Sequence, residues 1–475
     1  MRQQNWLEDL KEIVGVRNVL TDPMALLPYS YDGYTLVEST PRAVVLPQSR
    51  DEVAAVVKIL ARAEIPFLAR GAGTSLSGGA TALEGAVILH LSRMNHILEI
   101  DVENEVVVVE PGVVNVHITK AVEPYGYFYA PDPSSQQACT IGGNFAENSG
   151  GPHCLKYGVT VNHIVAAEVV TVDGDVVMLG NLAGEIDGPD WLGLLIGSEG
   201  TLVIATKLWL RLTKQPASSQ TILALFDEVD EASRAVSAIV AAGIIPAALE
   251  MMDQLAIDAV ERGPYPVGYP ADLRAVLLIE VDGERHEVLE TAREVEEILH
   301  SHRVREVKLA RTSEEKTRWW ANRKTAFGAM GLISPQYYVQ DGVIPRSQLP
   351  EALARIAAIA KRYDIRIANV FHAGDGNLHP LLLYDGRDPQ MVQRVIQAGS
   401  DILAVCVELG GSITGEHGVG VEKIEDMRRQ FGEGDLKAQA AVKTAWDSEG
   451  LLNPGKLLPT APRCHETGSG PVKRD

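Results

Sequence analysis

Basic residues are scarce in this chain. Its 475 residues include 43 Lys and Arg but 63 Asp and Glu, which gives a formal net charge of −20 at pH 7. A surface that binds nucleic acid needs an excess of Lys and Arg to neutralise phosphates, and adhesion to an anionic membrane needs the same. The composition therefore excludes nucleic acid as a partner and favours small molecules or proteins.

Long apolar runs are missing as well. No stretch reaches the roughly 18 apolar residues that span a bilayer, and the most apolar region, 235–252, is interrupted by Gly243 and Pro246. The N-terminal residues are polar and acidic, unlike those of a secretory signal peptide. We expect no transmembrane segment and a cytoplasmic location.

Cysteine is the third scarce residue. The chain has four cysteines and no C-x-x-C pair. Iron–sulfur clusters and thiolate zinc sites need clustered thiolates, so we expect neither. Four scattered thiols in a long chain are typical of a reducing cytoplasm. They are Cys139, Cys154, Cys406 and Cys464.

Glycine, serine and threonine are dense in residues 70–80, between an expected strand at 66–69 and another at 86–91. Such a loop exposes many backbone N–H groups and lets a ligand approach closely. These N–H groups can bind a diphosphate, which is an anion with many acceptor oxygens. A plain flexible connection is the alternative. A dinucleotide-binding G-x-G-x-x-G fingerprint is excluded because Gly71 and Gly73 are followed by Leu76 at the sixth position.

A second segment, 129–158, is rich in Gly, Asn and Ser. Such a composition does not suit an ordinary core element, and a buried loop must satisfy its backbone polar groups. A large polar ligand is one solution, and a long irregular surface loop is the alternative. Residues 193–204 read as a strand broken by a tight turn at Gly197 to Gly200.

The chain divides into two α/β units. A leading helix and lead-in occupy 1–37, a first unit 38–215, a second unit 216–460 and a tail 461–475. The second unit alternates strands and helices in a way consistent with a ferredoxin-like layer. Its expected elements are strand 221–226, helix 230–242, helix 251–260, strand 274–281, helix 284–300, helix 311–330, helix 348–363, strand 366–372, helix 388–408 and helix 435–447.

Two histidines flank a turn signal in the second unit. His372 and His379 lie on either side of Asp375-Gly376, a dipeptide typical of two-residue hairpins. A turn centred there would pair 372 with 379 and place both imidazoles opposite each other on one sheet face. Glu416 could then complete a His2Glu site that favours zinc or another borderline divalent ion. Histidine pairs at this spacing also arise by chance.

Three further residues are candidates for chemistry. His417, next to Glu416, could be a free general base. Arg323, on the helix with Trp319 and Trp320, could hold a substrate carboxylate, although it could equally be a surface cation. Asn377 could bond a substrate across the turn, although Asn after Asp-Gly is also ordinary turn chemistry.

The motifs together resemble a known family. Residues 41–215 resemble the flavin domain of the vanillyl-alcohol oxidase (PCMH) type, and 216–460 resemble the C-terminal domain of FAD-linked 2-hydroxyacid dehydrogenases. Within that family the flavin-bearing subunits of bacterial glycolate oxidase complexes are the most similar. The motifs that carry the likeness are RGAGTSLSGG (70–79), IGGN (141–144), GSEGTL (197–202), ISPQYY (333–338), DGVIPR (341–346), FHAGDGNLH (371–379), GEHG (415–418) and LNPGK (452–456).

This resemblance implies an α+β fold. A two-subdomain, PCMH-type FAD-binding domain would be followed by a ferredoxin-like substrate (cap) domain and a C-terminal helical segment. One departure is Ser75, where relatives often carry Gly. No histidine lies between Arg70 and Ala80, so we expect non-covalent FAD, although His153 leaves covalent attachment open. The residues that would bind FAD are Arg70, Gly71, Ala72, Gly73, Thr74, Ser75, Leu76, Pro131, Asp132, Ser134, Ser135, Thr140, Gly142, Gly143, Asn144, Asn148, Gly150, Glu199, Gly200, Ile204 and Asn453.

The implied activity is oxidation of a small 2-hydroxy acid, glycolate or D-lactate, to the 2-keto acid. The metal at His372, His379 and Glu416 would acidify the hydroxyl, His417 would take its proton, and hydride would pass to the flavin. A second flavin subunit and an iron–sulfur subunit are the implied partners, which could hold the protein at the inner face of the membrane. Alternatives are a stand-alone D-lactate or D-2-hydroxyglutarate dehydrogenase, an oxygen-using oxidase, and a non-catalytic electron-relay subunit.

Overall fold

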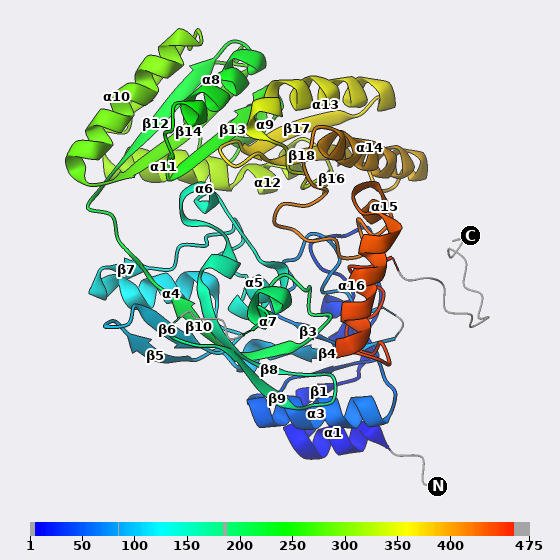
Figure 1. Cartoon of the computed structure of the whole chain (residues 1–475). Helices are drawn as coiled ribbons and strands as arrows, with labels where there is room; N and C mark the ends of the chain where they lie inside the picture. The colour runs from blue at the N-terminus through cyan, green and yellow to red at the C-terminus, as the bar shows by residue number, and fades with distance from the viewer. Residues whose placement is uncertain (1–4, 84, 184–187, 460–475) are drawn as a thin grey trace.

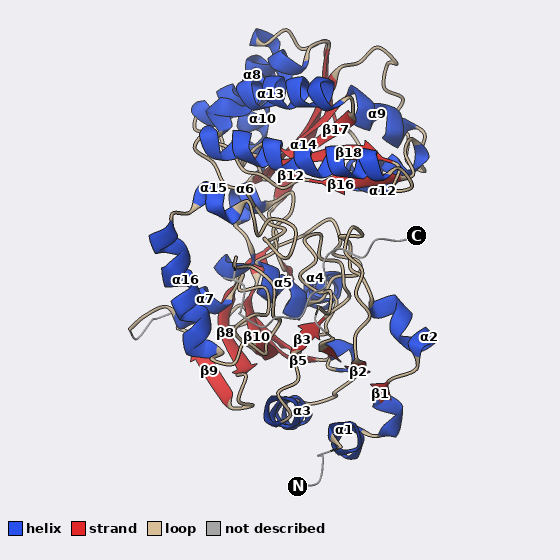
Figure 2. Ribbon diagram, turned by 90° about the vertical axis from the view of Figure 1, so that its right-hand side faces the viewer, coloured by secondary structure: helices blue, strands red, loops and turns tan. Residues whose placement is uncertain are grey.

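The computed structural model describes residues 5–83, 85–183 and 188–459. Two bodies are stacked on each other (Figure 1). The lower body contains two larger N-terminal sheets and a short two-stranded sheet of residues 127–128 and 213–214. The upper body contains one large sheet with helices on both faces (Figure 2). The red-orange helix α16 (Glu433–Trp446) runs from the upper body down along the lower one (Figure 1).

The first sheet of the lower body has the order β1-β2-β4-β3, with β2, β4 and β3 parallel. Helix α3 (Arg50–Arg62) begins at Ser49, whose hydroxyl accepts the Glu52 N–H at 3.2 Å. Its buried residues Val53, Val56, Val57 and Leu60 form one apolar face. The other elements are α1 (Trp6–Val14), β1 (Val19–Leu20), α2 (Pro23–Leu26), β2 (Ala43–Val45), β3 (Phe67–Arg70) and β4 (Val87–His90).

The second sheet of the lower body is antiparallel, in the order β5-β6-β10-β8-β9. Alternate valines of β6, Val107 and Val109, lie in the core that helices α4 and α5 cover. The elements are β5 (Ile97–Asp101), β6 (Val106–Val109), α4 (Asn115–Val122), β7 (Tyr127–Phe128), α5 (Ile141–Glu147), α6 (Cys154–Tyr157), β8 (Ile164–Val170), β9 (Val176–Gly180), α7 (Trp191–Leu195), β10 (Ile204–Arg211) and β11 (Thr213–Lys214).

The upper body is built on a seven-stranded antiparallel sheet, in the order β15-β12-β14-β13-β17-β18-β16. Helices α8, α10, α13 and α14 cover one face, and α9, α11 and α12 cover the other. The elements are β12 (Ser218–Phe226), α8 (Val229–Ala241), β13 (Ala248–Asp253), α9 (Gln254–Glu261), β14 (Ala275–Gly283), α10 (Arg285–Ser301), β15 (Glu306–Leu309), α11 (Ser313–Lys324), α12 (Ala326–Ala329), β16 (Gln336–Val339), α13 (Leu349–Tyr363), β17 (Arg366–His372), β18 (Asn377–Tyr384), α14 (Pro389–Glu408) and α15 (Met427–Gln430).

The end of the chain returns to the lower body. Leu452 forms a parallel bridge with Phe67, and the Asn453 N–H donates to Phe67 O at 2.7 Å. Leu451 and Leu452 are buried in the core beneath α1 and α3. The segment after α15 therefore packs with the first unit, although in sequence it follows the second.

Three expected elements differ in the structure. Residues 251–253, expected at the start of helix 251–260, are instead the end of strand β13, because β13 pairs with both β14 and β17. The Gly- and Asn-rich residues 141–147 form helix α5, whose Ile141 and Phe145 are buried in the core. Residues 191–195 form the short helix α7, and the strand begins only at Ile204.

Candidate functional site

A cavity of about 650 Å³ is lined by residues of both bodies. This volume lies in the range of cofactor and ligand sites. Most of the residues expected to bind FAD line it: Arg70, Gly71, Ala72, Gly73, Thr74, Ser75, Leu76, Ser134, Ser135, Thr140, Gly142, Gly143, Asn144, Gly150, Glu199, Gly200 and Ile204. From the upper body Arg323, His372, His379, Glu416 and His417 line the same cavity.

The glycine loop after β3 closes tightly on its surroundings. A Cβ on Gly71 would lie 2.1 Å from Thr140 Oγ1, and Gly73 has a φ of +71° with no room for a side chain beside Arg70. The Arg70 side chain stabilises this loop, because its guanidinium donates to Ala80 O at 2.9 Å and to Tyr31 O, in a neighbouring segment, at 2.8 Å. The loop can therefore bring backbone N–H groups close to a ligand.

Among the expected FAD residues that line the cavity in the described structure, two have a buried polar atom without a partner. Thr140 Oγ1 and Asn144 Nδ2 are both buried without a hydrogen bond. Buried polar atoms are rarely left unpaired, so these two await a polar ligand. The cavity volume, the close glycine loop and these two atoms fit an FAD molecule.

Four expected FAD residues are not among those that line the cavity in the described structure. Asn148 Oδ1 accepts the Val161 N–H at 2.8 Å, and Asn453 Nδ2 donates to Glu199 O at 2.8 Å. Pro131 O accepts from Asn115 at 3.0 Å, and Asp132 lies 3.3 Å from Lys324 Nζ. These four residues hold the loops that form the wall.

The histidine hairpin has a different register from the one expected. His372 pairs with Asn377, and His379 pairs with Val370, so a four-residue turn replaces the two-residue turn. The two histidines are therefore diagonal rather than opposite, which still places them on one sheet face. Their rings are perpendicular, with centroids 5.0 Å apart.

The turn is set by its neighbours. The Gly374 N–H donates to Leu249 O on β13 at 3.0 Å, and Gly376 O accepts the Ile344 N–H at 3.0 Å. Asn377 lies beneath Gly415, where a Cβ would meet its side chain at 2.7 Å. In the described structure Asn377 is not among the residues that line the cavity.

Glu416 joins the two histidines. Its Oε1 lies 3.1 Å from His379 Nε2 and 3.3 Å from His372 Nε2. The three ligand atoms lie within 4.8 Å of one another. Burial raises the pKa of the Glu416 carboxyl, but His372 and His379 outweigh it and hold that pKa well below its usual range. This ionised carboxylate with two imidazoles is a donor set that suits zinc.

Glu250 on β13 orients His372 from behind. Its carboxylate lies 2.8 Å from His372 Nδ1 and 2.5 Å from an Arg323 guanidinium nitrogen. Burial alone would lower the pKa of His372, but Glu250 and Glu416 on its two ring nitrogens raise it well above its ordinary value. Such a carboxylate behind a histidine fixes the ring for metal binding.

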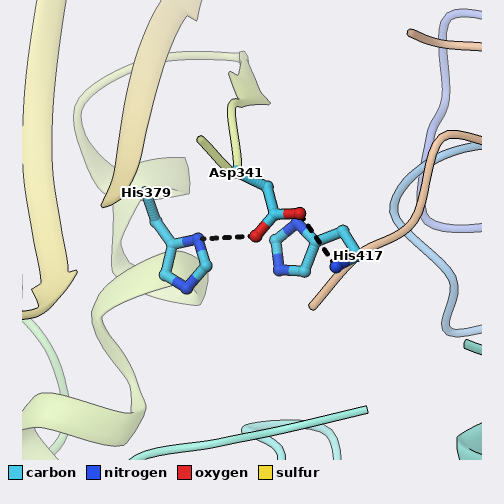
Figure 3. A group of neighbouring side chains, drawn as sticks. All are labelled: Asp341, His379 and His417. Carbon is cyan, nitrogen blue, oxygen red and sulfur yellow. Dashed lines mark hydrogen bonds and ion pairs between the residues drawn. The ribbon is translucent and has the colours of Figure 1, made fainter. Parts of the chain in front are cut away.

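Asp341 lies beside His379 and His417 (Figure 3), 3.9 Å from the His379 Nδ1. Its Oδ2 accepts the His417 N–H at 2.9 Å and the Thr414 hydroxyl at 2.6 Å. The ammonium of Lys423, which is fully buried, lies 3.3 Å from the same oxygen. Burial raises the pKa of Asp341, but His417 and Lys423 outweigh it and lower that pKa overall.

A second possible metal group consists of Asp341, His379 and His417. We favour the group of His372, His379 and Glu416 for a metal, because the Asp341 oxygens already accept from the 414–417 loop and Lys423. This choice leaves His417 free. Its ring stacks on His379 with centroids 4.8 Å apart, and burial lowers the pKa of His417 to about 4.

Sequence reasoning missed several residues of this site. Glu250 was recognisable only as an acid inside the apolar region 235–252, directly before the expected helix 251–260. Asp341 and Lys423 gave no local signal of their partners. Five further residues that line the cavity were also missed: Tyr31, Asp32, Glu147, Lys324 and Phe327.

The described residues contain no helix with the length and apolar character of a membrane span.

The chain matches two families. Residues 215–457 match "FAD linked oxidases, C-terminal domain", and residues 41–180 match "FAD binding domain". It is 47% identical to the glycolate oxidase subunit GlcD of Escherichia coli K12, over 97% of this chain and 92% of the relative. It is 32% identical to the D-lactate dehydrogenase of Anaerostipes hadrus, over 95% of this chain and 96% of the relative.

The fold is similar to that of p-cresol methylhydroxylase. That structure has a TM-score of 0.79 at 19% identity, with 95% of this chain and 96% of the other covered. A 4-ethylphenol oxidase from Gulosibacter chungangensis also has a TM-score of 0.79, at 19% identity, with 96% and 97% covered. Both likenesses concern the fold alone. They agree with the expected PCMH-type architecture of two FAD-binding subdomains and a second α+β unit.

Proposed function

Because the chain belongs to the FAD-linked oxidase family and is an FAD-linked oxidoreductase, we propose that it oxidises a small 2-hydroxy acid, glycolate or D-lactate, to the 2-keto acid. One observation carries the proposal. The His372–His379–Glu416 group and the free His417 line the same cavity as the glycine loop, so a substrate held there can reach both a metal and a flavin.

The proposed metal ligands are His372, His379 and Glu416. A zinc ion held by them would lower the pKa of a bound substrate hydroxyl. Glu250 fixes the His372 ring through Nδ1, and Phe327 packs edge-on against His379 with centroids 5.7 Å apart. These contacts keep both imidazoles in place for metal binding.

His417 is the proposed general base. Its backbone N–H is held by Asp341 and its ring is stacked on His379, so the imidazole has little freedom. A neutral imidazole can accept the proton of the substrate hydroxyl as the C2–H bond breaks. Bound FAD would supply the acceptor for the hydride that leaves C2 and for both of its electrons. The 2-keto acid then remains, and the hydroxyl proton is on His417.

Arg323 is the proposed anchor for the substrate carboxylate. One guanidinium nitrogen is paired with Glu250, whereas Nε is buried without a partner in the described structure. Because Arg323 lines the cavity, that free donor can meet a carboxylate. Glu250 would then tie the substrate anchor to the metal ligand His372.

We further propose that FAD is held without a covalent bond and that electrons leave through partner subunits. His153, the one histidine that left covalent attachment open, is not among the residues lining the cavity in the described structure. It pairs with Asp132 and stacks on Trp320. The likeness to glycolate oxidase subunit GlcD supports a complex, for which a second flavin subunit and an iron–sulfur subunit are the proposed partners. A stand-alone D-lactate dehydrogenase is the second candidate, favoured by the likeness to that enzyme.

The test is anaerobic bleaching of the flavin by a panel of glycolate, D-lactate, L-lactate and D-2-hydroxyglutarate. We expect glycolate or D-lactate to bleach the wild type fastest, and His417→Ala to slow that reaction by about 10²-fold or more. Acetate, which has the carboxylate of glycolate but no hydroxyl, is the matched control and should leave the flavin oxidised. A flavin that no member of the panel bleaches would contradict the proposed activity and leave an electron-relay role.

A further inference from the structure

Glu147 is a partly buried acid with a fully buried Oε2, and the proposed mechanism does not use it. It is the last residue of α5 and lines the cavity. Three loops meet around it: the glycine loop, the turn at 198–200 and the turn at 418–420 that follows His417. Its position therefore connects the expected FAD site with the loop that carries the proposed base.

The Glu147 carboxyl touches both loops. A Cβ on Gly79 would lie 2.9 Å from its Oε1, and the Ser75 hydroxyl of the same loop lowers the pKa of Glu147 in part. A Cβ on Gly418 would lie 2.6 Å from Glu147 Oε2 and 2.7 Å from Glu199 Oε1. One carboxyl oxygen of each acid therefore lies close to Gly418, the residue that follows His417 in the sequence.

The two acids differ in their partners. Glu199 accepts the Val419 N–H at 2.6 Å and the Gly420 N–H at 2.7 Å, one on each oxygen. Glu147 Oε2 is buried with no hydrogen-bond partner in the described chain. Two N–H donors favour the ionised form of Glu199, so its neighbour Glu147 is the one to keep a proton. Burial, and then the charge of Glu199, raise the pKa of Glu147 well above its ordinary value.

The surrounding charges agree with a neutral Glu147. The charged groups that face it are Asp32 from the 28–34 segment, Glu199, Lys423 and Lys456. Lys423 is already paired with Asp341. Asp32 and Glu199 already match the two other cations of this cluster, Lys456 and Arg70, so a further negative charge on Glu147 would be uncompensated.

We propose that Glu147 keeps a proton beside the ionised Glu199, and that the two acids act as a positioning pair that joins the FAD loop to the His417 loop. FAD binds most tightly while that proton is in place. Loss of the proton would put a second negative charge beside a cavity that takes a diphosphate, and would loosen the contact between the two loops. This inference rests on FAD binding and not on the identity of the substrate.

The experiment measures the dissociation constant of FAD from the purified holoenzyme. The protein is diluted in buffers from about pH 6 to about pH 9, and the fluorescence of released FAD is recorded. Glu147→Gln keeps a neutral donor of the same shape. Glu168→Gln is the matched control, because Glu168 is a buried acid of the same body, bonded to Thr206 and not among the cavity residues.

In the wild type we expect FAD affinity to fall roughly tenfold over this range as Glu147 ionises, the scale of one unpaired charge in a partly buried site. In Glu147→Gln the fall should shrink to about twofold, whereas Glu168→Gln should follow the wild type. A purely structural Glu147 would change the affinity at every pH without changing its pH dependence.

Two results would overturn the proposal. One is a Glu147→Gln protein whose affinity falls with pH as steeply as that of the wild type. The other is a Glu147→Gln protein that binds FAD far more weakly than the wild type at about pH 6, because an ionised carboxylate would then be required. A protein that passes this test yet oxidises no 2-hydroxy acid would contradict the proposed function alone.

Discussion

Replacing Asp341 by Asn tests whether Asp341 holds the loop 414–418, which carries the proposed base His417. Asp341 accepts hydrogen bonds from Thr414, Gly415 and His417, and it is the counter-charge of Lys423. The amide introduced by Asp341→Asn would present an NH2 group to these donors and would leave the Lys423 ammonium, fully buried, without a carboxylate. Breaking a buried pair on one side costs about 3–5 kcal/mol. For a body of this size that corresponds to a fall of roughly 10 °C in Tm.

The assay is thermal unfolding, with metal content and anaerobic flavin bleaching measured on the same samples. Asp426→Asn is the matched control, because Asp426 is also buried but pairs with Arg429, which is largely exposed. We expect a loss of about 1 kcal/mol there, and full activity. If Asp341→Asn has the same Tm as Asp426→Asn, and its flavin is bleached at the wild-type rate, Asp341 does not hold the loop.

The pH dependence of this contact has a defined sign. The pKa of Asp341 is lower in the folded protein than its ordinary value of 3.8. Its contribution to stability is therefore fully present above that ordinary value and is lost as the pH falls toward the folded pKa. The difference in unfolding free energy between wild type and Asp341→Asn should shrink in this acid range and stay constant above it.

Three further predictions concern the cavity. His372→Ala and His379→Ala should lose the metal and turnover while FAD stays bound, whereas His417→Ala should keep both the metal and FAD. Elemental analysis would measure the metal content, and the flavin spectrum would measure the bound FAD. Gly73→Val should lower FAD occupancy, because Gly73 has a φ of +71° and a Cβ there would meet the Arg70 guanidinium; Gly434→Val, at an exposed helical position with open space around it, is the control. Glu250→Gln should weaken metal binding by roughly 10–100-fold, since it removes the carboxylate behind His372; unchanged metal affinity would show that the Glu250 contact does not support the ligand.

Local sequence signals predicted the parts of the site that are made locally. The glycine loop between two buried strands and the Glu416-His417 pair lie where their motifs indicated, on the wall of one cavity. The hairpin register was not predictable from Asp375-Gly376, because Gly374 and Gly376 bond to Leu249 and Ile344 on other elements. Contacts across the chain thus outweighed the turn preference.

The residues that orient the site could not be predicted from local sequence, because their partners lie far away along the chain. Glu250 meets His372 across 122 residues of sequence, and Asp341 meets His417 across 76. Residues 251–253 were assigned to the start of helix 251–260, yet they belong to β13, which pairs with strands on both sides. Pairing between distant strands decides such a segment more strongly than its own helix propensity.

The central claim is that the metal group and the flavin cavity form one catalytic site. It is tested most directly by removing the metal with a chelator and recording the anaerobic rate of flavin bleaching by glycolate or D-lactate, before and after zinc is returned. We expect bleaching to slow by about 10²-fold or more without metal, with FAD still bound, and to recover with zinc. A metal-free protein whose flavin bleaches at the original rate would contradict it.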